Sequence, residues 1–263
     1  MGIRSIRRRA LDGEILVGTW LVLGSSLTAE IAGNSGFDWV VLDMEHGMGG
    51  SDSLLSQLQA VAATPAAPIV RVAFNDPVLI KRALDLGPAG IMAPMVSTAE
   101  DAERVVRAMR YPPQGIRGVT PYTRPADFGR EFREYFATAN DDLICLVQIE
   151  TEKAVDSADE IAAVDGVDVL FIGPLDLTVG LGIMKQFDHP KYRAAVERIV
   201  SACRKAGKVP GIILLDVEVP EDTVADGFTF IGRASDGSVL AAALSGLVEP
   251  FRKFKTESQR PSE

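Results

Sequence analysis

A chain of 263 residues with 47% hydrophobic side chains can form one large domain or two small ones around a substantial core. Its net charge of −9 argues against non-specific binding of nucleic acid. No apolar run approaches the roughly 20 residues of a membrane span, and the basic start is not followed by the apolar segment of a secretory signal. The two cysteines, Cys145 and Cys203, lie in apolar or helical contexts typical of free, buried thiols, so we expect a cytoplasmic protein.

Strand and helix signals alternate along the chain. Short apolar runs bounded by turn residues predict strands, and helical periodicity preceded by capping residues predicts helices. The predicted strands cover residues 15–23, 39–45, 68–72, 89–95, 143–149, 167–172, 209–215 and 228–232. Helices are predicted over residues 26–34, 51–63, 152–163, 190–206 and 236–254. Two further helices are predicted, one capped at Asn75 or Asp76 and one from a capping-type start at residues 97–100 to Arg110. Two connections, residues 111–141 and 173–188, are predicted to be long irregular loops, which are usually functional or interfacial.

Eight strand–helix units without a composition break predict one closed (β/α)8 barrel, a TIM barrel, over residues 1–255. A doubly wound open sheet is the alternative, but no GxGxxG opens a helix after the first strand. Residues 256–263 are predicted to form a disordered tail. In a barrel, the active residues lie at the C-terminal ends of the strands.

Two neighbouring strands each deliver one acid to that end. The apolar strand over residues 143–149 runs into Glu150, and the strand over residues 167–172 leads to a turn that carries Asp176. Carboxylate oxygens are preferred by Mg²⁺ and Mn²⁺, whereas the absence of a Cys/His cluster disfavours zinc. The alternative is that both acids pair with arginine or lysine. The pattern therefore indicates, without deciding, a divalent-metal platform.

Arg71 and His46 are the other polar residues that stand out at strand ends. Arg71 interrupts the apolar strand PIVRV, so its guanidinium must bind a substrate oxygen or pair with a buried acid. His46 follows DME directly at a strand end, where a histidine can act as a general base; a purely structural role is the alternative. The other histidine, His189, precedes a proline at a helix start and is expected to be a capping or surface residue.

Five motifs in chain order carry a resemblance to a known family. They are FDWVVLDMEHG, VRVAFNDPVLIKRALDLG, APMVSTAEDAERVVRAMRYPPQGIRGV, LVQIET and GVDVLFIGPLDLTVGLG. Over residues 13–254 the chain resembles the HpcH/HpaI superfamily of metal-dependent, class II pyruvate aldolases. The group it is most similar to contains the 2-dehydro-3-deoxyglucarate and 4-hydroxy-2-oxoheptanedioate aldolases.

The resemblance implies a barrel that binds Mg²⁺, Mn²⁺ or Co²⁺ through Glu150 and Asp176, with no organic cofactor. It implies a lyase that cleaves or forms 4-hydroxy-2-oxo acids, giving pyruvate and an aldehyde through an enolate held on the metal. Arg71 matches the arginine that steadies the developing enolate oxygen. Gln148, Leu175 and Asp176 match substrate-binding positions, with the Leu175 contact expected through its backbone amide.

The resemblance also implies that His46 moves the proton and that Asp85 orients this histidine and raises its basicity. Because Asp85 falls near the end of a helix that runs away from the active face, we expect it to reach His46 of a neighbouring subunit. The family's habit of forming hexamers, as trimers of dimers that exchange a C-terminal helix, agrees with this. The partners implied are therefore a 2-oxo acid, an aldehyde and further copies of the chain, with neither nucleic acid nor membrane.

Three positions depart from the family pattern. Residues 118–128, GVTPYTRPADF, replace a small-residue stretch and are expected to help cover the substrate. Leu175 replaces a smaller residue, and Arg233 stands where a small or apolar residue is usual. Arg233 could pair with Asp236 or recognise an anionic substrate.

Two other functions stay open beside the aldolase, and two more are disfavoured. An oxaloacetate decarboxylase or macrophomate-synthase-like enzyme would use the same enolate, and a 2-oxo acid sensor would bind without turnover. An acyl-CoA lyase is disfavoured because no basic cleft suited to a nucleotide is evident. A Schiff-base aldolase is disfavoured because no lysine ends a predicted strand.

Overall fold

The structure, a computed structural model, describes residues 5–214 and 220–258. All eight strands are parallel to their neighbours and close into one barrel in chain order, which confirms the predicted (β/α)8 fold and excludes the open sheet. The strands are β1 (Leu16–Leu21), β2 (Trp39–Asp43), β3 (Ala67–Arg71), β4 (Gly90–Ala93), β5 (Ile144–Ile149), β6 (Val169–Ile172), β7 (Val209–Leu214) and β8 (Phe230–Ser235).

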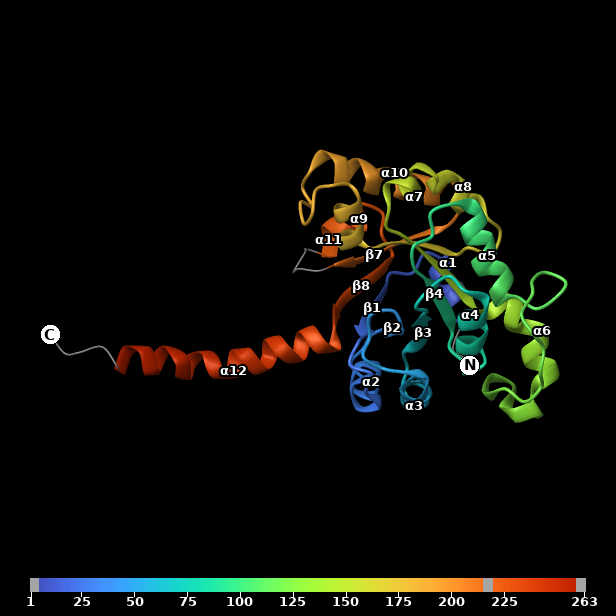
Figure 1. Ribbon diagram of the computed structural model, residues 1–263, viewed down its shortest axis with the longest axis horizontal. Helices are drawn as coiled ribbons and strands as arrows, with labels where there is room; N and C mark the ends of the chain where they lie inside the picture. The colour runs from blue at the N-terminus through green and yellow to red at the C-terminus, as the bar shows by residue number, and fades with distance from the viewer. Residues whose placement is uncertain (1–4, 215–219, 259–263) are drawn as a thin grey trace.

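Helices surround the barrel, except that α12 extends away from it (Figure 1). They are α1 (Ile6–Leu11), α2 (Ser26–Gly33), α3 (Ser51–Val61), α4 (Pro77–Leu84), α5 (Ala99–Met109), α6 (Phe132–Asp142), α7 (Glu152–Asp156), α8 (Ala158–Ala163), α9 (Pro174–Gly180), α10 (Pro190–Ala206), α11 (Pro220–Ala225) and α12 (Asp236–Ser258), with a 3-10 helix, η1 (Arg124–Gly129). None of the helices that the structure describes has the length and apolar character needed to cross a membrane.

Capping residues fix several helix starts where the sequence predicts them. Asp76 accepts hydrogen bonds from the backbone N–H groups of Val78 and Leu79, and Pro77 occupies the first turn of α4. Thr98 accepts from the N–H of Asp101 at the start of α5. Both helices therefore begin a few residues after the C-terminal end of the preceding strand.

The structure differs from the sequence-based expectation in the connections. The two segments predicted to be irregular contain α6 and α9, and α1 and α11 were not predicted. The helix expected over residues 152–163 is divided at Ser157, which has non-helical dihedral angles. Short amphipathic helices of this kind owe their stability to tertiary packing more than to local propensity, which explains why sequence periodicity misses them.

The ends of the seventh strand and of α12 differ from their predicted positions or lie outside the described residues. The predicted seventh strand includes Leu215, which lies outside the described residues, as do residues 259–263 of the predicted tail. α12 continues to Ser258, beyond the predicted end at Phe254.

Aromatic side chains fill the interior of the barrel. Trp39 stacks on Phe230 with ring centroids 4.5 Å apart, and Trp20 meets Trp39 edge-on at 5.7 Å. Gly18 leaves the space that Trp39 occupies, because a Cβ there would lie 2.0 Å from an atom of the indole ring. The lumen is therefore a packed core and not a channel, and chemistry is confined to its ends.

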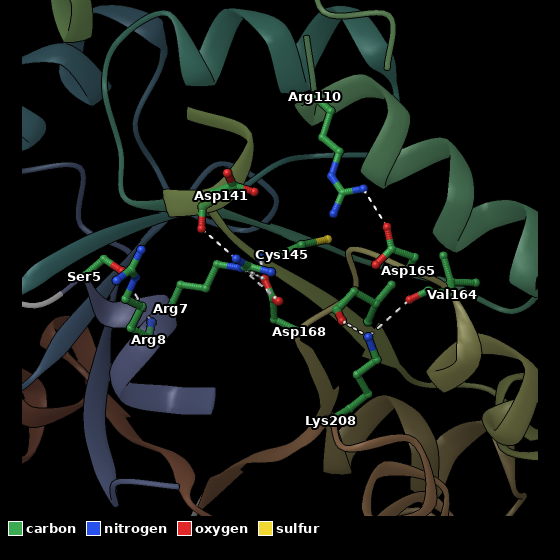
Figure 2. A network of polar contacts seen from close by, with 11 residues as sticks. Ser5, Arg7, Arg8, Arg110, Asp141, Cys145, Val164, Asp165, Asp168 and Lys208 are labelled. Atoms are coloured by element: carbon green, nitrogen blue, oxygen red, sulfur yellow. Dashed lines mark hydrogen bonds and ion pairs between the residues drawn. The ribbon is translucent and has the colours of Figure 1, made fainter. Parts of the chain in front are cut away.

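α1 closes the N-terminal end of the barrel. Ile6 and Ala10 are buried in the same cluster as the lumen aromatics. Figure 2 shows how Arg7 reaches Asp168, whose carboxylate accepts from the Arg7 Nε at 3.0 Å and from the Cys145 N–H at 2.9 Å. With this end sealed, the open mouth lies at the C-terminal ends of the strands.

Candidate active site

An arginine and an aspartate at adjacent strand ends form the base of the site. Asp43 ends β2 and Arg71 ends β3, directly opposite one another in the parallel register. The Arg71 Nε and Nη2 donate to the two Asp43 carboxylate oxygens at 2.9 and 2.6 Å. The Asp43 carboxylate also accepts from the backbone N–H groups of Glu45 and His46 at 3.0 and 3.3 Å. Asp43 therefore fixes both the guanidinium and the turn that carries Glu45 and His46.

Arg71 also has a second acidic neighbour, since its Nη1 lies 3.0 Å from Glu45 Oε2. Burial opposes the charge of Arg71, but the hydrogen bond and charge of Asp43, aided by Glu45, outweigh it and raise the Arg71 pKa. The buried-acid alternative for Arg71 is thus realised. It does not exclude a ligand at Nη1, because Asp43 engages only the opposite edge of the guanidinium.

His46 lies at the rim of the mouth. Its side chain is 69% exposed, and its Nε2 is 3.8 Å from Glu45 Oε2. Burial raises the pKa of Glu45, against the charges of Arg71 and His46. An exposed imidazole beside a half-buried carboxylate can exchange protons with a ligand at the mouth.

Glu150 follows β5 and is almost fully buried. Its Oε1 accepts from the Gln148 Nε2 at 2.6 Å, and its Oε2 accepts from the Met95 N–H at 3.1 Å. Burial, aided by the charges of Asp176 and Glu45, raises the pKa of Glu150 to about 7, against the Met95 hydrogen bond and the charge of Arg71. A carboxylate that is buried among other acids calls for an added cation.

The β6–α9 turn brings the second acid to Glu150. Gly173 precedes α9 and closely approaches Glu150, since a Cβ on Gly173 would lie 2.7 Å from Glu150 Oε1. Leu175 and Asp176 occupy the exposed first turn of the helix, where backbone N–H groups have no intrahelical acceptor. The predicted contact of a ligand with the Leu175 amide is geometrically open.

The residues at the mouth fit a divalent ion held by two protein carboxylates. In the part of the chain that is described, no three histidine, cysteine, aspartate or glutamate residues are grouped to hold a metal. The fit rests on Glu150 and Asp176, whose charges act on each other, and on the electrostatic demand of the buried Glu150. A site with two carboxylates leaves positions for water and substrate, as Mg²⁺ and Mn²⁺ sites do.

Asp85 is not near this mouth. It is the C-cap of α4, and the chain enters the N-terminal end of β4 soon after it. Its carboxylate Oδ1 instead accepts from the Nη2 of Arg117 at 3.2 Å. Within one chain the structure therefore gathers His46, Arg71, Gln148, Glu150, Leu175 and Asp176 but leaves Asp85 at the other end of the barrel.

The segment of residues 118–128 also lies away from the mouth of its own barrel. Arg124 Nη1 donates to the backbone carbonyl of Leu86 at 2.8 Å, which holds the segment against the end of α4. The expectation that it covers the substrate is wrong within a single chain. Helix packing, rather than its composition, decides where this segment lies.

Asp236 links the ends of β1 and β8. Its carboxylate accepts from the Val22 N–H at 2.8 Å and from Thr28 Oγ1 at 2.7 Å. These contacts to backbone and hydroxyl groups give Asp236 a role at the start of α12 that does not depend on pairing with Arg233, one of the two alternatives for that arginine.

Sequence reasoning missed the roles of Asp43, Met95 and Arg117. Asp43 was recognisable as an acid at a strand end, but its pairing with Arg71 depends on the strand register, which only the structure gives. Met95 donates its N–H to Glu150 from a left-handed conformation, with φ 55°, that no residue preference predicts. The hydrogen-bond partners of Arg117, Asp85 and Tyr135, are distant in sequence, so sequence reasoning could not pair them with it.

The fold and the site together define a (β/α)8-barrel protein with an acidic, arginine-containing site at its C-terminal mouth. The sequence model of the HpcH/HpaI aldolase/citrate lyase family matches residues 16–243, and the chain belongs to this family. It is a carbon–carbon lyase.

Three known proteins illustrate the relationship. The 4-hydroxy-2-oxo-heptane-1,7-dioate aldolase of Klebsiella pneumoniae subsp. pneumoniae is 41% identical over 239 residues, 91% of this chain and 90% of the relative. The crystal structure of a family member from Burkholderia cenocepacia J2315 has a TM-score of 0.89 at 38% identity, covering 94% of this chain and 98% of the other. Macrophomate synthase has a TM-score of 0.86 at 25% identity, covering 97% and 92%.

Proposed function

We propose that this lyase is a divalent-metal-dependent aldolase that cleaves 4-hydroxy-2-oxo acids to pyruvate and an aldehyde. The observation that carries the proposal is the meeting of Glu150, Asp176 and Arg71 at one barrel mouth. Cleavage of the bond β to the keto group leaves an enolate, so the site must stabilise a developing negative charge. The likeness to the Klebsiella aldolase supports the substrate class.

Glu150 and Asp176 would hold Mg²⁺, Mn²⁺ or Co²⁺, and the proposal includes no organic cofactor. When bound, the ion supplies Lewis-acid stabilisation of the keto and carboxylate oxygens of the 2-oxo acid. Gln148, at 2% exposure, holds Glu150 through its Nε2 and leaves its Oε1 without a partner in the structure. This arrangement orients the carboxylate and supports a place for Gln148 beside the substrate.

The remaining groups stabilise the developing negative charge and transfer the proton. Arg71 Nη1 stabilises the oxygen that becomes negative, while Asp43 holds the guanidinium in place. His46 accepts the proton of the 4-hydroxyl during cleavage and returns one to the aldehyde oxygen during synthesis. The Leu175 N–H binds the substrate, and the Leu175 side chain narrows the space for the aldehyde.

The proposal includes a homohexamer, arranged as a trimer of dimers, in the cytoplasm. α12 projects from the barrel (Figure 1), and its apolar side chains are exposed, including Leu247 at 70% and Phe251 at 69%. An exposed apolar stripe of this size requires a partner surface, and a second copy exchanging its own helix supplies one. The same assembly would bring Asp85 of one subunit to His46 of another.

The test is pyruvate release from 4-hydroxy-2-oxo acids of graded chain length, measured with Mg²⁺, Mn²⁺, Co²⁺ or EDTA. We expect release to require a divalent ion. Glu150→Gln and Asp176→Asn should each lower kcat/KM at least about a hundredfold, because they remove several kcal/mol of charge stabilisation. Asp188→Asn, a change at a 96%-exposed carboxylate paired with Arg193, is the matched control. Full activity in EDTA would contradict the proposal.

A decarboxylase or macrophomate-synthase-like enzyme is the second candidate, favoured by the similarity to macrophomate synthase. It would use the same enolate but lose CO₂ in place of an aldehyde. His46→Ala separates the two, since retro-aldol cleavage needs a base at the hydroxyl and decarboxylation does not. We expect the variant to lose cleavage, whereas oxaloacetate decarboxylation would survive.

A sensor without turnover would show no metal-stimulated exchange of the pyruvate methyl protons.

A further inference from the structure

Arg117 is a fully buried cation that the proposed chemistry does not use. Its side chain has no exposed surface, and it lies outside the barrel, among residues that follow α5 and residues of α6. The guanidinium carbon is 4.5 Å from the centre of the Tyr111 ring and 5.6 Å from that of Tyr135. A charge taken out of water in this way is costly unless an anion compensates it.

Asp85 is the carboxylate that meets this cation. Arg117 Nη2 donates to Asp85 Oδ1 at 3.2 Å, and Arg117 Nη1 donates to the Tyr135 hydroxyl at 3.0 Å. Burial raises the pKa of Tyr111 to about 12 and raises that of Tyr135, so both phenols stay neutral near pH 7. The two aromatic rings and the one acid thus form a cage that fixes the guanidinium plane.

Asp85 faces outward from this cage. Its side chain is 26% exposed, and only its Oδ1 is engaged by Arg117. A carboxylate at the C-cap of α4 is electrostatically unfavourable for the helix, whose C-terminus carries partial negative charge. Helix stability therefore gives no reason for an acid here, whereas an outward oxygen held from behind by a rigid cation is suited to accept a hydrogen bond from outside the chain.

We infer that Arg117 is a positioning residue that fixes the Asp85 carboxylate so that its outward oxygen accepts from the imidazole of His46 of the partner subunit. The inference rests on the proposed function, in which Asp85 orients that histidine. Other charged groups near Asp85 are Lys81, whose Cδ approaches Gly118, and Arg124, which binds the Leu86 carbonyl. On the side of His46 the charged groups are Glu45, Arg71 and Asp43.

Positioning and plain electrostatics predict opposite effects on the histidine. Removing the positive charge of Arg117 would by itself raise the pKa of a nearby imidazole. Removing a residue that aims Asp85 takes away the oriented acceptor and lowers that pKa, as removing the Asp85 carboxylate does. A solely structural role would leave the histidine pKa unchanged. The acidic limb of the pH–rate profile reports this pKa, because the base must be unprotonated.

The experiment compares Arg117→Gln and Asp85→Asn in the full-length, metal-loaded protein, using exchange of the pyruvate methyl protons with solvent as a function of pH. Both variants should lower the rate at least about tenfold, part of the roughly 10²–10⁴-fold contribution of general acid–base catalysis. Both should move the acidic limb to lower pH. The double variant should be no slower than Asp85→Asn, because the two residues act as one unit.

Arg124→Gln is the matched control, since Arg124 also lies beside the C-terminal end of α4 but donates to the Leu86 carbonyl and not to Asp85. Its rate and acidic limb should stay at wild-type values. If Arg117→Gln does not fold, Arg117→Lys keeps a cation but loses the planar stacking. We then expect an acidic limb between those of the wild type and Asp85→Asn.

If the acidic limb of the pH–rate profile in an Arg117 variant stayed in place or moved to higher pH, the inference would be overturned. The role of Asp85 would remain intact. An Asp85→Asn variant with wild-type rate and limb would overturn both, and with them this part of the proposed function. Sedimentation velocity on each variant establishes that the oligomer is the same, so that lost assembly is not mistaken for lost positioning.

Discussion

The acids at the barrel mouth differ in how the protein holds them. Asp43 is fully buried and paired with Arg71, whereas Glu150 is buried among further carboxylates, with neutral donors from Gln148 and Met95. The first arrangement stabilises a charged carboxylate, and the second disfavours one. The surroundings of Glu150 therefore do not balance a negative charge on its carboxylate, which supports the proposal that Glu150 binds a metal ion.

This difference predicts a pH dependence for the metal-free protein. The pKa of Glu150 is about 7 in the folded state against an ordinary value of 4.5. Between these values the folded state binds more protons than the unfolded state, so the free energy of unfolding should fall as the pH rises from about 4.5 to about 7. We expect a loss on the order of a few kcal/mol, measured by urea unfolding in EDTA at fixed protein concentration.

Glu150→Gln is the control for this prediction, since it keeps a neutral side chain of the same shape at every pH. Glu45, whose pKa burial also raises, is present in both proteins, so the difference between their slopes isolates Glu150. Parallel pH profiles for the two proteins would show that Glu150 titrates normally.

Part of the site could be predicted from the sequence, residue by residue, and part could not. Strand periodicity placed Glu150, Asp176, Arg71 and His46 at one face, because the ends of parallel strands share an edge of the barrel. The sequence could not show that Asp43 takes two of the guanidinium nitrogens, since that depends on strand register. Nor could it show the left-handed backbone of Met95, which depends on tertiary context.

At the scale of elements, α1 was not predicted from the sequence, although it closes the N-terminal end of the barrel. Only Ile6 and Ala10 of this six-residue helix are buried, too weak a pattern to predict a helix. Arg7 attaches the helix to the barrel through Asp168 and through the Asp141 carbonyl, at 2.6 Å (Figure 2). By contrast, strong caps made α4, α5 and α10 predictable, with α10 at its observed bounds.

Arg7→Met should weaken the packing of α1 against the N-terminal end of the barrel. It leaves the Asp168 carboxylate, 3% exposed, without its cation, at a cost of about 1–3 kcal/mol. Cys145 lies beside this contact, and burial keeps the pKa of its thiol raised and the thiol unreactive. In a Cys203→Ala background, we expect the variant to react with a thiol reagent at least about tenfold faster, because reaction requires local opening.

Arg8→Met is the matched control, because Arg8 occupies the same helix with an exposed side chain. Equal reaction rates in the two variants would mean that Arg7 does not hold α1 in place.

At the scale of the whole molecule, α12 is the helix whose apolar side chains remain exposed on a single barrel. Its exposed apolar residues recur at helical spacing and so form one stripe. The stripe consists of Leu240, Leu244, Leu247, Val248, Phe251 and Phe254. The sequence predicted the helix, and its extended placement (Figure 1) leaves this stripe exposed, which supports the proposed exchange of α12 with a second copy.

Leu244→Glu should disrupt the assembly, because it places a charge in the centre of the stripe. We expect a smaller sedimenting species and, if Asp85 acts across subunits, a parallel loss of pyruvate proton exchange. Ser245→Glu puts the same charge on the neighbouring position of α12, outside the stripe, and should preserve the oligomer. A Leu244→Glu protein of unchanged mass would show that α12 does not hold the subunits together.

The aromatic filling of the lumen has a consequence for observing the protein. The chain has two tryptophans, Trp20 and Trp39, and both are packed inside the barrel beneath the mouth. All indole fluorescence of the folded protein therefore originates within the lumen, next to the floor of the site. Unfolding must shift this emission to the red as water reaches the rings, and ligands entering the mouth can be followed by intrinsic emission without an attached dye.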